Sequence, residues 1–372
     1  MSSRTHHLAS LDAFRGLTVA GMVLVNNPGN WSTVFESLTH AGWEGCTLAD
    51  LVFPFFIFIL GAAMPFAFGR RIERGHRGRD LYVRIARRSA WLIALGLVLN
   101  MVAALPSVTS LRIPGVLQRI GLVYLVTAPM VIQVRPAWRV VTVVVLLIGH
   151  WALLTLVPFG GAAAGLAQSH NLSGFIDQGM FGRHILTATG DPEGLLGTIP
   201  AVGGALLGSL AGDWLRRDQS PWARVAGLVV GGVAVLVAGI IWTYALPLNK
   251  SLWTGSFVLF TGGLAALILA ACYVLLDVLD NRSWARPFLW LGFNPLAIYF
   301  LAELLGHTLD QPWMRVAGQS TTPRTWLFFD LLQPALPGIG DEWISLMFAL
   351  LTVALWVAVA GVLYRQGIRI QV

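Results

Sequence analysis

The sequence predicts an all-α integral membrane protein, a polytopic helical bundle with about ten transmembrane helices. Hydrophobic residues make up 56% of the 372 residues, and charged residues only 12%, about half the share found in soluble domains. The mean hydropathy is +0.70. Apolar windows of about 20 residues, the length that a helix needs to cross a bilayer, follow one another along nearly the whole chain. We therefore expect one transmembrane domain over residues 1–372.

The apolar windows place the predicted spans in order along the chain, with ends uncertain by about four residues. They cover 12–28, 47–69, 89–106, 114–133, 137–158, 194–215, 224–245, 252–277, 286–304 and 343–364. We read the first as an uncleaved span, because no small-residue cleavage site follows it.

Two of the connecting segments, 159–193 and 305–342, are too long to be simple loops. Structureless loops beyond about 15 residues are uncommon, so both segments should hold structure or function. Within the second segment, the apolar stretch 326–332 predicts a short interfacial or re-entrant helix.

Basic residues are distributed unequally over the connections. With the N-terminus in the cytoplasm, the inner loops and termini collect 19 arginines and the outer ones four arginines and one lysine. Inner loops of membrane proteins are enriched in basic residues, which predicts that both termini are cytoplasmic. The inner residues are Arg4, Arg15, Arg70, Arg71, Arg74, Arg77, Arg79, Arg84, Arg87, Arg88, Arg135, Arg139, Arg216, Arg217, Arg224, Arg282, Arg286, Arg365 and Arg369; the outer ones are Arg112, Arg183, Lys250, Arg315 and Arg324.

The basic balance, with a pI near 10.1, would suggest nucleic-acid binding in a soluble protein. Here the predicted membrane topology explains the excess of basic residues, and we expect no nucleic-acid partner. The arginine-rich stretch 70–88 binds either anionic lipid headgroups or the phosphates of a cofactor. We find no zinc spacing and expect no metal. Cys46 and Cys272 fall near opposite ends of different spans, so no disulfide is predicted.

Polar residues inside the predicted spans are the candidates for a functional site, because ionisable groups in a bilayer are costly. Asp50 and Arg119 lie at matching depth, which predicts an ion pair between the second and fourth spans. Gln118 could extend this network. Asn294 precedes a proline in mid-span, where it either satisfies a freed carbonyl or faces a cavity. His150 is alone in its span, and we expect a hydrogen-bonded core histidine.

His40 lies on the short outer connection between the first two spans, after Asn26 at the end of the first. A neutral imidazole there could accept a proton from an attacking amine or hydroxyl. The alternative is an interfacial histidine solvated by headgroups, and the residue type alone leaves both open.

Three more candidates face the same outer side. Asp191 and Glu193 open the sixth span, where carboxylates also suit a helix N-terminus. Lys250, the one lysine of the chain, opens the eighth span. These residues could contact a substrate entering from outside.

The motifs around these residues resemble the heparan-α-glucosaminide N-acetyltransferase family, and they occur in the same order over residues 11–294. The matching blocks are LDAFRG at 11–16, VN at 25–26, HAGWEG at 40–45, ADLVFPF at 49–55, GVLQRIG at 115–121, DPEGLLGT at 191–198, NKSLW at 249–253 and FLWLGFN at 288–294.

The resemblance implies a transmembrane acyltransferase that moves an acetyl group from cytosolic acetyl-CoA to the amino group of a glucosamine-like sugar on the outer face. It implies that His40 is the catalytic histidine, as general base or acetyl carrier, and that Asn26 assists it. The CoA phosphates would lie on the cytoplasmic face, with Arg70 and Arg71 as candidates. The chain resembles a bacterial relative in the inner membrane, whose acceptor would be an envelope or scavenged amino sugar.

Two other functions remain open. The first is a transporter of a sugar or lipid-linked intermediate. Interrupted spans at matching positions in two halves of the chain would support this function. The second is a structural membrane partner without catalysis. Membrane lipids are expected to surround the bundle in each case, and a homodimer is one possible assembly.

Overall fold

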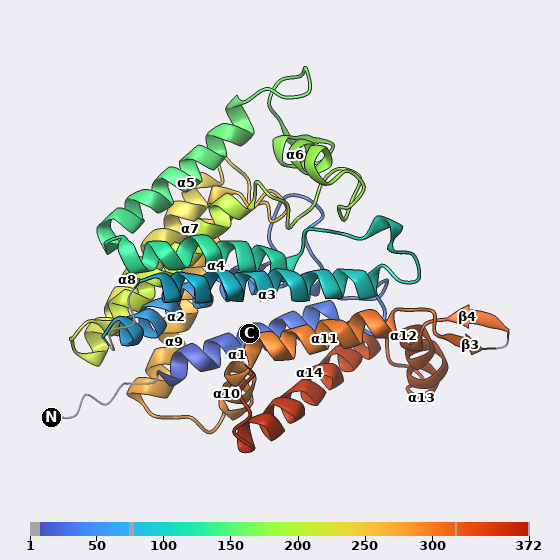
Figure 1. Ribbon diagram of the computed structural model, residues 1–372. Coiled ribbons are helices and arrows are strands. Elements are labelled where there is room, and N and C mark those ends of the chain that lie inside the picture. Colours follow the sequence, from blue (N-terminus) through green and yellow to red (C-terminus); the bar gives the residue numbers. More distant parts are fainter. Residues whose placement is uncertain (1–7, 74–77, 317, 371–372) are drawn as a thin grey trace.

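The computed structural model describes residues 8–73, 78–316 and 318–370, apart from the side chains of residues 70–73 and 110 (Figure 1). The chain folds as a bundle of long helices with two small hairpins, so the predicted all-α membrane fold is confirmed. The long helices are α1 (Ala9–Asn26), α2 (Leu48–Glu73), α3 (Arg79–Ala103), α4 (Val116–Gln133), α5 (Pro136–Leu156), α7 (Thr198–Arg216), α8 (Pro221–Trp242), α9 (Gly255–Tyr273), α10 (Arg286–Phe293), α11 (Pro295–Leu309) and α14 (Asp341–Arg365).

Shorter elements occupy the connections. They are the turns η1 (Glu36–Leu38) and η2 (Val108–Ser110), the π-helices η3 (Val274–Val278) and η4 (Leu327–Leu332), the helices α6 (Leu172–Phe181), α12 (Pro323–Trp326) and α13 (Gln333–Ala335), and the strands β1 (Leu166–Ala167), β2 (His170–Asn171), β3 (Met314–Val316) and β4 (Gln319–Thr321). Strand β1 pairs antiparallel with β2, and β3 pairs antiparallel with β4.

Every predicted span falls on a long helix or, for 286–304, on the pair α10–α11. Within the described ranges, seven helices are long and apolar enough to cross a bilayer, and the pair α10–α11, bent by 88°, makes an eighth. The two remaining predicted spans fall on α1 and α7, which are less apolar. Both lie inside the bundle: α1 packs on α2, α9, α10, α11 and α14, while α7 packs on α2, α4, α5 and α9. A helix that contacts protein on several sides does not need an apolar surface against lipid.

The arginine-rich stretch 70–88 lies between two predicted spans, but its described residues are mostly helical. Helix α2 continues to Glu73 and α3 begins at Arg79, after Gly78 with φ 104°. Leu81 and Ile85, four residues apart, are buried on one face of α3, so this arginine-rich segment is amphipathic and folds as a helix. The side chains of Arg70 and Arg71 lie outside the described part of the structure.

Glycines bring α2 and α7 into backbone contact. A Cβ atom on Gly61 would lie 1.9 Å from the carbonyl oxygen of Ala205, and one on Gly208 would lie 1.9 Å from that of Phe58. No side chain fits at either position. Small residues allow such close approach in membrane bundles, and this contact fixes the helix that carries Asp50.

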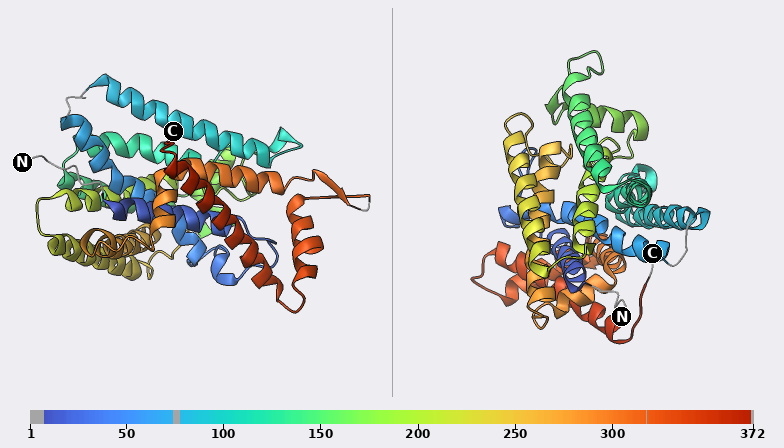
Figure 2. Two further views of the ribbon diagram at one scale, coloured as in Figure 1. Left: turned by 90° about the horizontal axis from the view of Figure 1, so that it is seen from below. Right: turned by 90° about the vertical axis from the view of Figure 1, so that its left-hand side faces the viewer.

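The two long connecting segments hold structure, as predicted. Residues 159–193 form β1, β2 and α6, and residues 305–342 form the β3–β4 hairpin and the helical turns of α12, η4 and α13. The expected helix at 326–332 is therefore confirmed. Both segments lie at the end of the bundle where α3 meets α4, and the β3–β4 hairpin projects beyond it (Figures 1 and 2).

His150 contradicts its prediction as a hydrogen-bonded core histidine. The residue is fully buried in α5, and neither ring nitrogen has a hydrogen-bond partner among the described residues. A buried polar group without a partner costs about 1–3 kcal/mol.

Replacing His150 with leucine should therefore raise the free energy of unfolding by about 1–2 kcal/mol, because leucine needs no hydrogen-bond partner in this apolar setting. Thermal unfolding of the purified variant in detergent measures the change against the unmodified protein. A marked drop in Tm would mean that the imidazole has a bound partner, such as a buried water, that its removal destroys.

Candidate functional site

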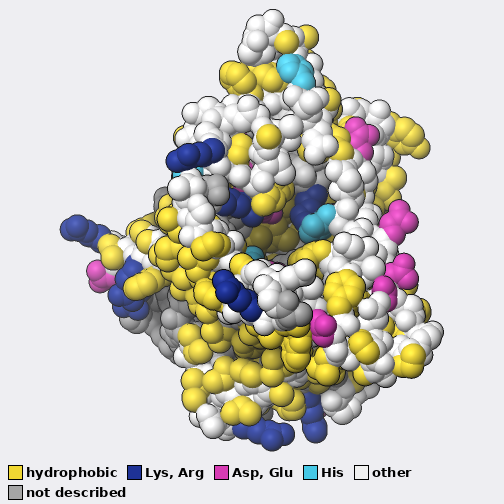
Figure 3. Space-filling model, turned by 90° about the vertical axis from the view of Figure 1, so that its right-hand side faces the viewer, with side chains coloured by type: hydrophobic (Ala, Val, Ile, Leu, Met, Phe, Trp, Pro, Cys, Tyr) yellow, Lys and Arg dark blue, Asp and Glu magenta, His cyan; other side chains and the backbone are white. Residues whose placement is uncertain are grey.

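A cavity of about 450 Å³ opens at the end of the bundle that carries the two long connecting segments. Figure 3 looks onto this end and shows a hollow with histidine and basic side chains inside it. The ends of α1, α2, α3, α4 and α11 form its walls, together with the loops around His40 and Lys250. Of the residues predicted from sequence, the cavity is lined by Asn26, His40, Asp50, Gln118, Glu193 and Lys250.

His40 and Asp50 form a hydrogen-bonded pair at the mouth of the cavity. Nδ1 of His40 lies 2.8 Å from Oδ1 of Asp50. The His40 side chain is 51% exposed, whereas the Asp50 side chain is 1% exposed. In the tautomer with its proton on Nδ1, the neutral ring donates to this carboxylate and has the lone pair on Nε2. A base with a buried carboxylate behind it is the arrangement that orients histidines in acyl transfer.

The local fold holds Asp50 firmly. Its Oδ2 accepts hydrogen bonds from the backbone N–H of Ala41 at 3.0 Å and of Thr47 at 3.1 Å, and from Oγ1 of Thr47 at 3.1 Å. Asp50 lies in the first turn of α2, where a helix N-terminus favours a negative charge. These contacts tie the His40 loop to α2.

The motif residues after His40 shape this loop. Gly45 has φ 110°, a backbone conformation that favours glycine, and its N–H donates to the carbonyl of Leu248 at 2.8 Å. Nε1–H of Trp43 donates to the carbonyl of Leu166 at 2.9 Å. These two hydrogen bonds fasten the loop to both neighbouring segments.

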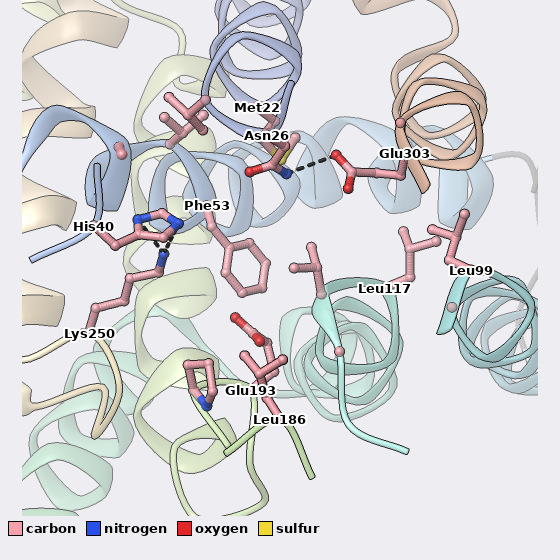
Figure 4. Close-up of a pocket in the computed structure, with 18 of the residues that line it drawn as sticks. Met22, Asn26, His40, Phe53, Leu99, Leu117, Leu186, Glu193, Lys250 and Glu303 are labelled. Atoms are coloured by element: carbon pink, nitrogen blue, oxygen red, sulfur yellow. Dashed lines mark hydrogen bonds between the residues drawn. The ribbon is translucent and has the colours of Figure 1, made fainter. Parts of the chain in front are cut away.

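Lys250 completes the polar cluster at His40. Its Nζ lies 3.1 Å from Nδ1 and 3.2 Å from Nε2 of His40, and 3.5 Å from Oδ1 of Asp50 (Figure 4). Burial lowers the pKa of Lys250, and the charges of Glu193 and Asp50 only partly offset this. This amine therefore gives up its proton more readily than an exposed lysine does, so it can exchange protons beside the base.

Asn26 faces the cavity from the end of α1. Its Nδ2 donates a hydrogen bond to Oε1 of Glu303 on α11 at 2.8 Å (Figure 4). One amide hydrogen is therefore engaged, and the other has no hydrogen-bond partner among the described residues. Such a hydrogen can stabilise a developing oxyanion.

The two candidate acids of the DPEG block behave differently. Arg112 binds Asp191 with two nitrogens, at 2.8 and 2.6 Å, and also pairs with Glu193. Burial alone would raise the pKa of Asp191, but the hydrogen bond and charge of Arg112 outweigh it and hold that pKa below its usual value. Glu193 lines the cavity, whereas Asp191 does not. Asp191 therefore anchors the loop, and only Glu193 can contact a substrate.

The predicted Asp50–Arg119 ion pair is wrong. Arg119 donates instead to the carbonyl of Gly194 at 2.9 Å, and its guanidinium carbon lies 4.8 Å from the ring centroid of Trp253. Gln118 lines the cavity and donates to the carbonyl of Ile113 at 3.0 Å. Successive residues of a helix point about 100° apart, so Arg119 points away from the cavity that Gln118 lines.

Asn294, which was predicted to support the site as Asp50, Arg119 and Gln118 were, lies apart from the polar groups of the cavity. Its Nδ2 donates to the carbonyl of Ile368 at 2.9 Å, and its Oδ1 accepts from the N–H of Ile370 at 2.9 Å. It fastens the C-terminal segment to the break between α10 and α11, and it neither lines the cavity nor satisfies the carbonyl freed by Pro295.

Apolar side chains form the remaining wall of the cavity. Met22, Phe53, Leu99, Leu117 and Leu186 surround the polar groups (Figure 4). An apolar wall limits water near a reactive acyl group and strengthens electrostatic contacts.

Cys46 lies close to Asp50 but is unsuited as a nucleophile. Burial, and after it the charge of Asp50, raises the pKa of its thiol to about 12. Only the thiolate is nucleophilic, so Cys46 stays inert at neutral pH. Within the described ranges, no group of three or more histidine, cysteine or acidic side chains is arranged to hold a metal ion.

The family model for the catalytic region of heparan-alpha-glucosaminide N-acetyltransferase matches residues 8–230. The chain belongs to this family. Heparan-alpha-glucosaminide N-acetyltransferase of Homo sapiens is 28% identical over 428 aligned residues, which cover 99% of this chain and 60% of the human protein. The protein of the same name from Mus musculus is 28% identical over 424 residues, covering 98% and 60%. The chain thus spans about 60% of the length of these curated relatives.

The chain is accordingly a multi-pass membrane protein of this acetyltransferase family. The matched region contains His40, Asn26, Asp50 and Glu193. Glu303, His307 and Asp310 also line the cavity. They lie beyond the residues that the family model matches, and they were not predicted from the sequence. A signal for Glu303 was present, because an acidic residue within a predicted span marks a site by default.

Proposed function

We propose that this chain transfers an acetyl group from acetyl-CoA to the amino group of a glucosamine-like sugar. The observation that carries the proposal is the His40–Asp50 pair at 2.8 Å in a cavity formed by the family motifs. The pair leaves Nε2 of a neutral imidazole as the base that acyl transfer to an amine requires.

The chemistry follows from these groups. The amine nitrogen attacks the thioester carbonyl, and a C–N bond forms as the C–S bond breaks. Nε2 of His40 takes a proton from the nitrogen and returns it to the departing CoA thiolate. Asn26 and Lys250 can stabilise the negative oxygen of the tetrahedral intermediate. The same Nε2 could instead carry the acetyl group in a first step.

The expected topology assigns the two substrates to opposite faces. The charge distribution supports cytoplasmic termini and a cavity that opens outward. In this arrangement the CoA phosphates bind at the basic cytoplasmic end, with Arg70 and Arg71 as candidates. An envelope or scavenged amino sugar enters from outside, in a bacterial inner membrane.

The proposal is tested with purified protein in liposomes, with acetyl-CoA on one face and glucosamine on the other. We expect N-acetylglucosamine and free CoA in equal amounts, detected by mass spectrometry and a thiol reagent. Radiolabelled acetyl-CoA without acceptor shows whether the protein itself becomes acetylated. Passage of the sugar without acetylation would favour the transporter. If the protein neither acetylates nor transports the sugar, the remaining function is that of a structural membrane partner.

A further inference from the structure

Four carboxylates line the cavity, and they differ in their partners. Asp50 contacts Lys250 and His40, Glu193 pairs with Arg112, and Asp310 accepts from Nε of Arg324 at 2.5 Å. Each of these three therefore has a cationic or ionisable nitrogen within reach.

Glu303 is the exception among the described residues. Its hydrogen-bond partner is the neutral amide of Asn26, at 2.8 Å, and no ion pair of Glu303 is found in the described part of the chain. The basic side chains around the cavity are engaged elsewhere: Arg112 by Asp191 and Glu193, Arg324 by Asp310, and Lys250 by Asp50. Glu303 is thus the cavity carboxyl group that has no ion-pair partner among the described residues.

The position of Glu303 places this charge on the cavity wall. Glu303, His307 and Asp310 all line the cavity, and their spacing of four and three residues puts them on one side of α11 and of its C-cap, Asp310. In Figure 4, Glu303 reaches toward Asn26 from α11, across the cavity from His40 and Lys250. Glu303 and His40 therefore both face the interior of this cavity.

We propose that Glu303, held by Asn26, binds the ammonium group of the acceptor and so selects amines over neutral alcohols. A carboxylate that lines a cavity and has no cationic partner in the protein is suited to pair with a cation on a bound molecule. An amino sugar brings that cation, because a primary ammonium carries its charge and three N–H donors into the site. This inference rests on the proposed acetyl transfer and names the group that recognises its acceptor.

The proton balance of the reaction fits this role. A protonated amine must lose one proton before it can attack and a second as the amide forms. Glu303 takes the first proton and becomes a neutral carboxyl group, which later returns the proton to water. His40 takes the second and passes it to the CoA thiolate.

Glu303→Gln tests the proposal, since glutamine has the same shape and can still bond Asn26. We expect the KM for glucosamine to rise about 10- to 100-fold, the effect of losing one hydrogen bond to a charged group. The KM for acetyl-CoA should stay within twofold. Glu342→Gln, at the exposed start of α14 on the same end of the bundle, is the matched control and should change neither value.

A binding measurement separates this inference from the proposed function. Glucosamine binding without acetyl-CoA, measured by calorimetry, should weaken by the same factor in Glu303→Gln, whether or not the protein catalyses transfer. Equal glucosamine affinity in the folded variant overturns the role of Glu303, even if wild-type transfer is robust. If Glu303→Gln fails to fold, Glu303→Asp keeps the charge but shortens its reach, and unchanged glucosamine affinity there would also overturn the proposal.

Discussion

Replacing His40 with alanine should lower the rate of acetyl transfer by about 10²–10⁴-fold, the usual effect of losing a general base. The alanine variant should stay folded and bind acetyl-CoA as before, because half of the His40 side chain is exposed and the loop is also held by Trp43 and Gly45. Initial rates of CoA release with glucosamine present measure the loss, and size-exclusion chromatography in detergent checks the fold.

The matched control for this variant is His150→Leu, which removes a histidine far from the cavity lining. It should transfer acetyl groups at the wild-type rate. Wild-type turnover by His40→Ala would show that His40 is not the base.

Asp50→Asn should lower the rate by about 10²–10⁴-fold, for a different reason. The backbone N–H groups of Ala41 and Thr47 require an oxygen at Oδ2, so the new amide nitrogen must face Nδ1 of His40. The amide then donates to Nδ1, and the ring carries its proton on Nε2. That tautomer cannot accept a proton from the amine.

The two variants differ in a way that can be measured. Asp50→Asn should keep the KM for both substrates near the wild-type values and lose kcat, because the binding surface is unchanged while the base has the wrong tautomer. An Asp50→Asn variant that retains its kcat would show that the carboxylate has only a structural role at the start of α2.

The sequence predicted the helices well, since long apolar windows and their polar breaks depend on local composition alone. Motif residues that are distant in the sequence, such as Asn26, His40, Glu193 and Lys250, meet in one cavity. The pairing of charges was not predictable in the same way. Depth in the membrane follows from position within a span, whereas the direction of a side chain depends on how each helix is rotated.

Asp50 and Arg119 illustrate this limit. Both lie one turn inside their helices, at similar depth, yet Arg119 turns toward Gly194 and Trp253 while Asp50 turns toward His40. Asn294 shows the same limit at the break between α10 and α11. The proline after it indicated an interrupted span, but its side chain bonds the backbone of Ile368 and Ile370, more than 70 residues later.

The position of Lys250 gives the protein an uncommon chemical handle. It is the one lysine in the chain, and its amine lies inside the cavity beside His40. Reagents that modify primary amines, such as succinimidyl esters, usually decorate a protein at many surface positions. Here, apart from the N-terminal amine, they would label a single position in the cavity, so a fluorophore coupled to Lys250 would report directly on what enters it.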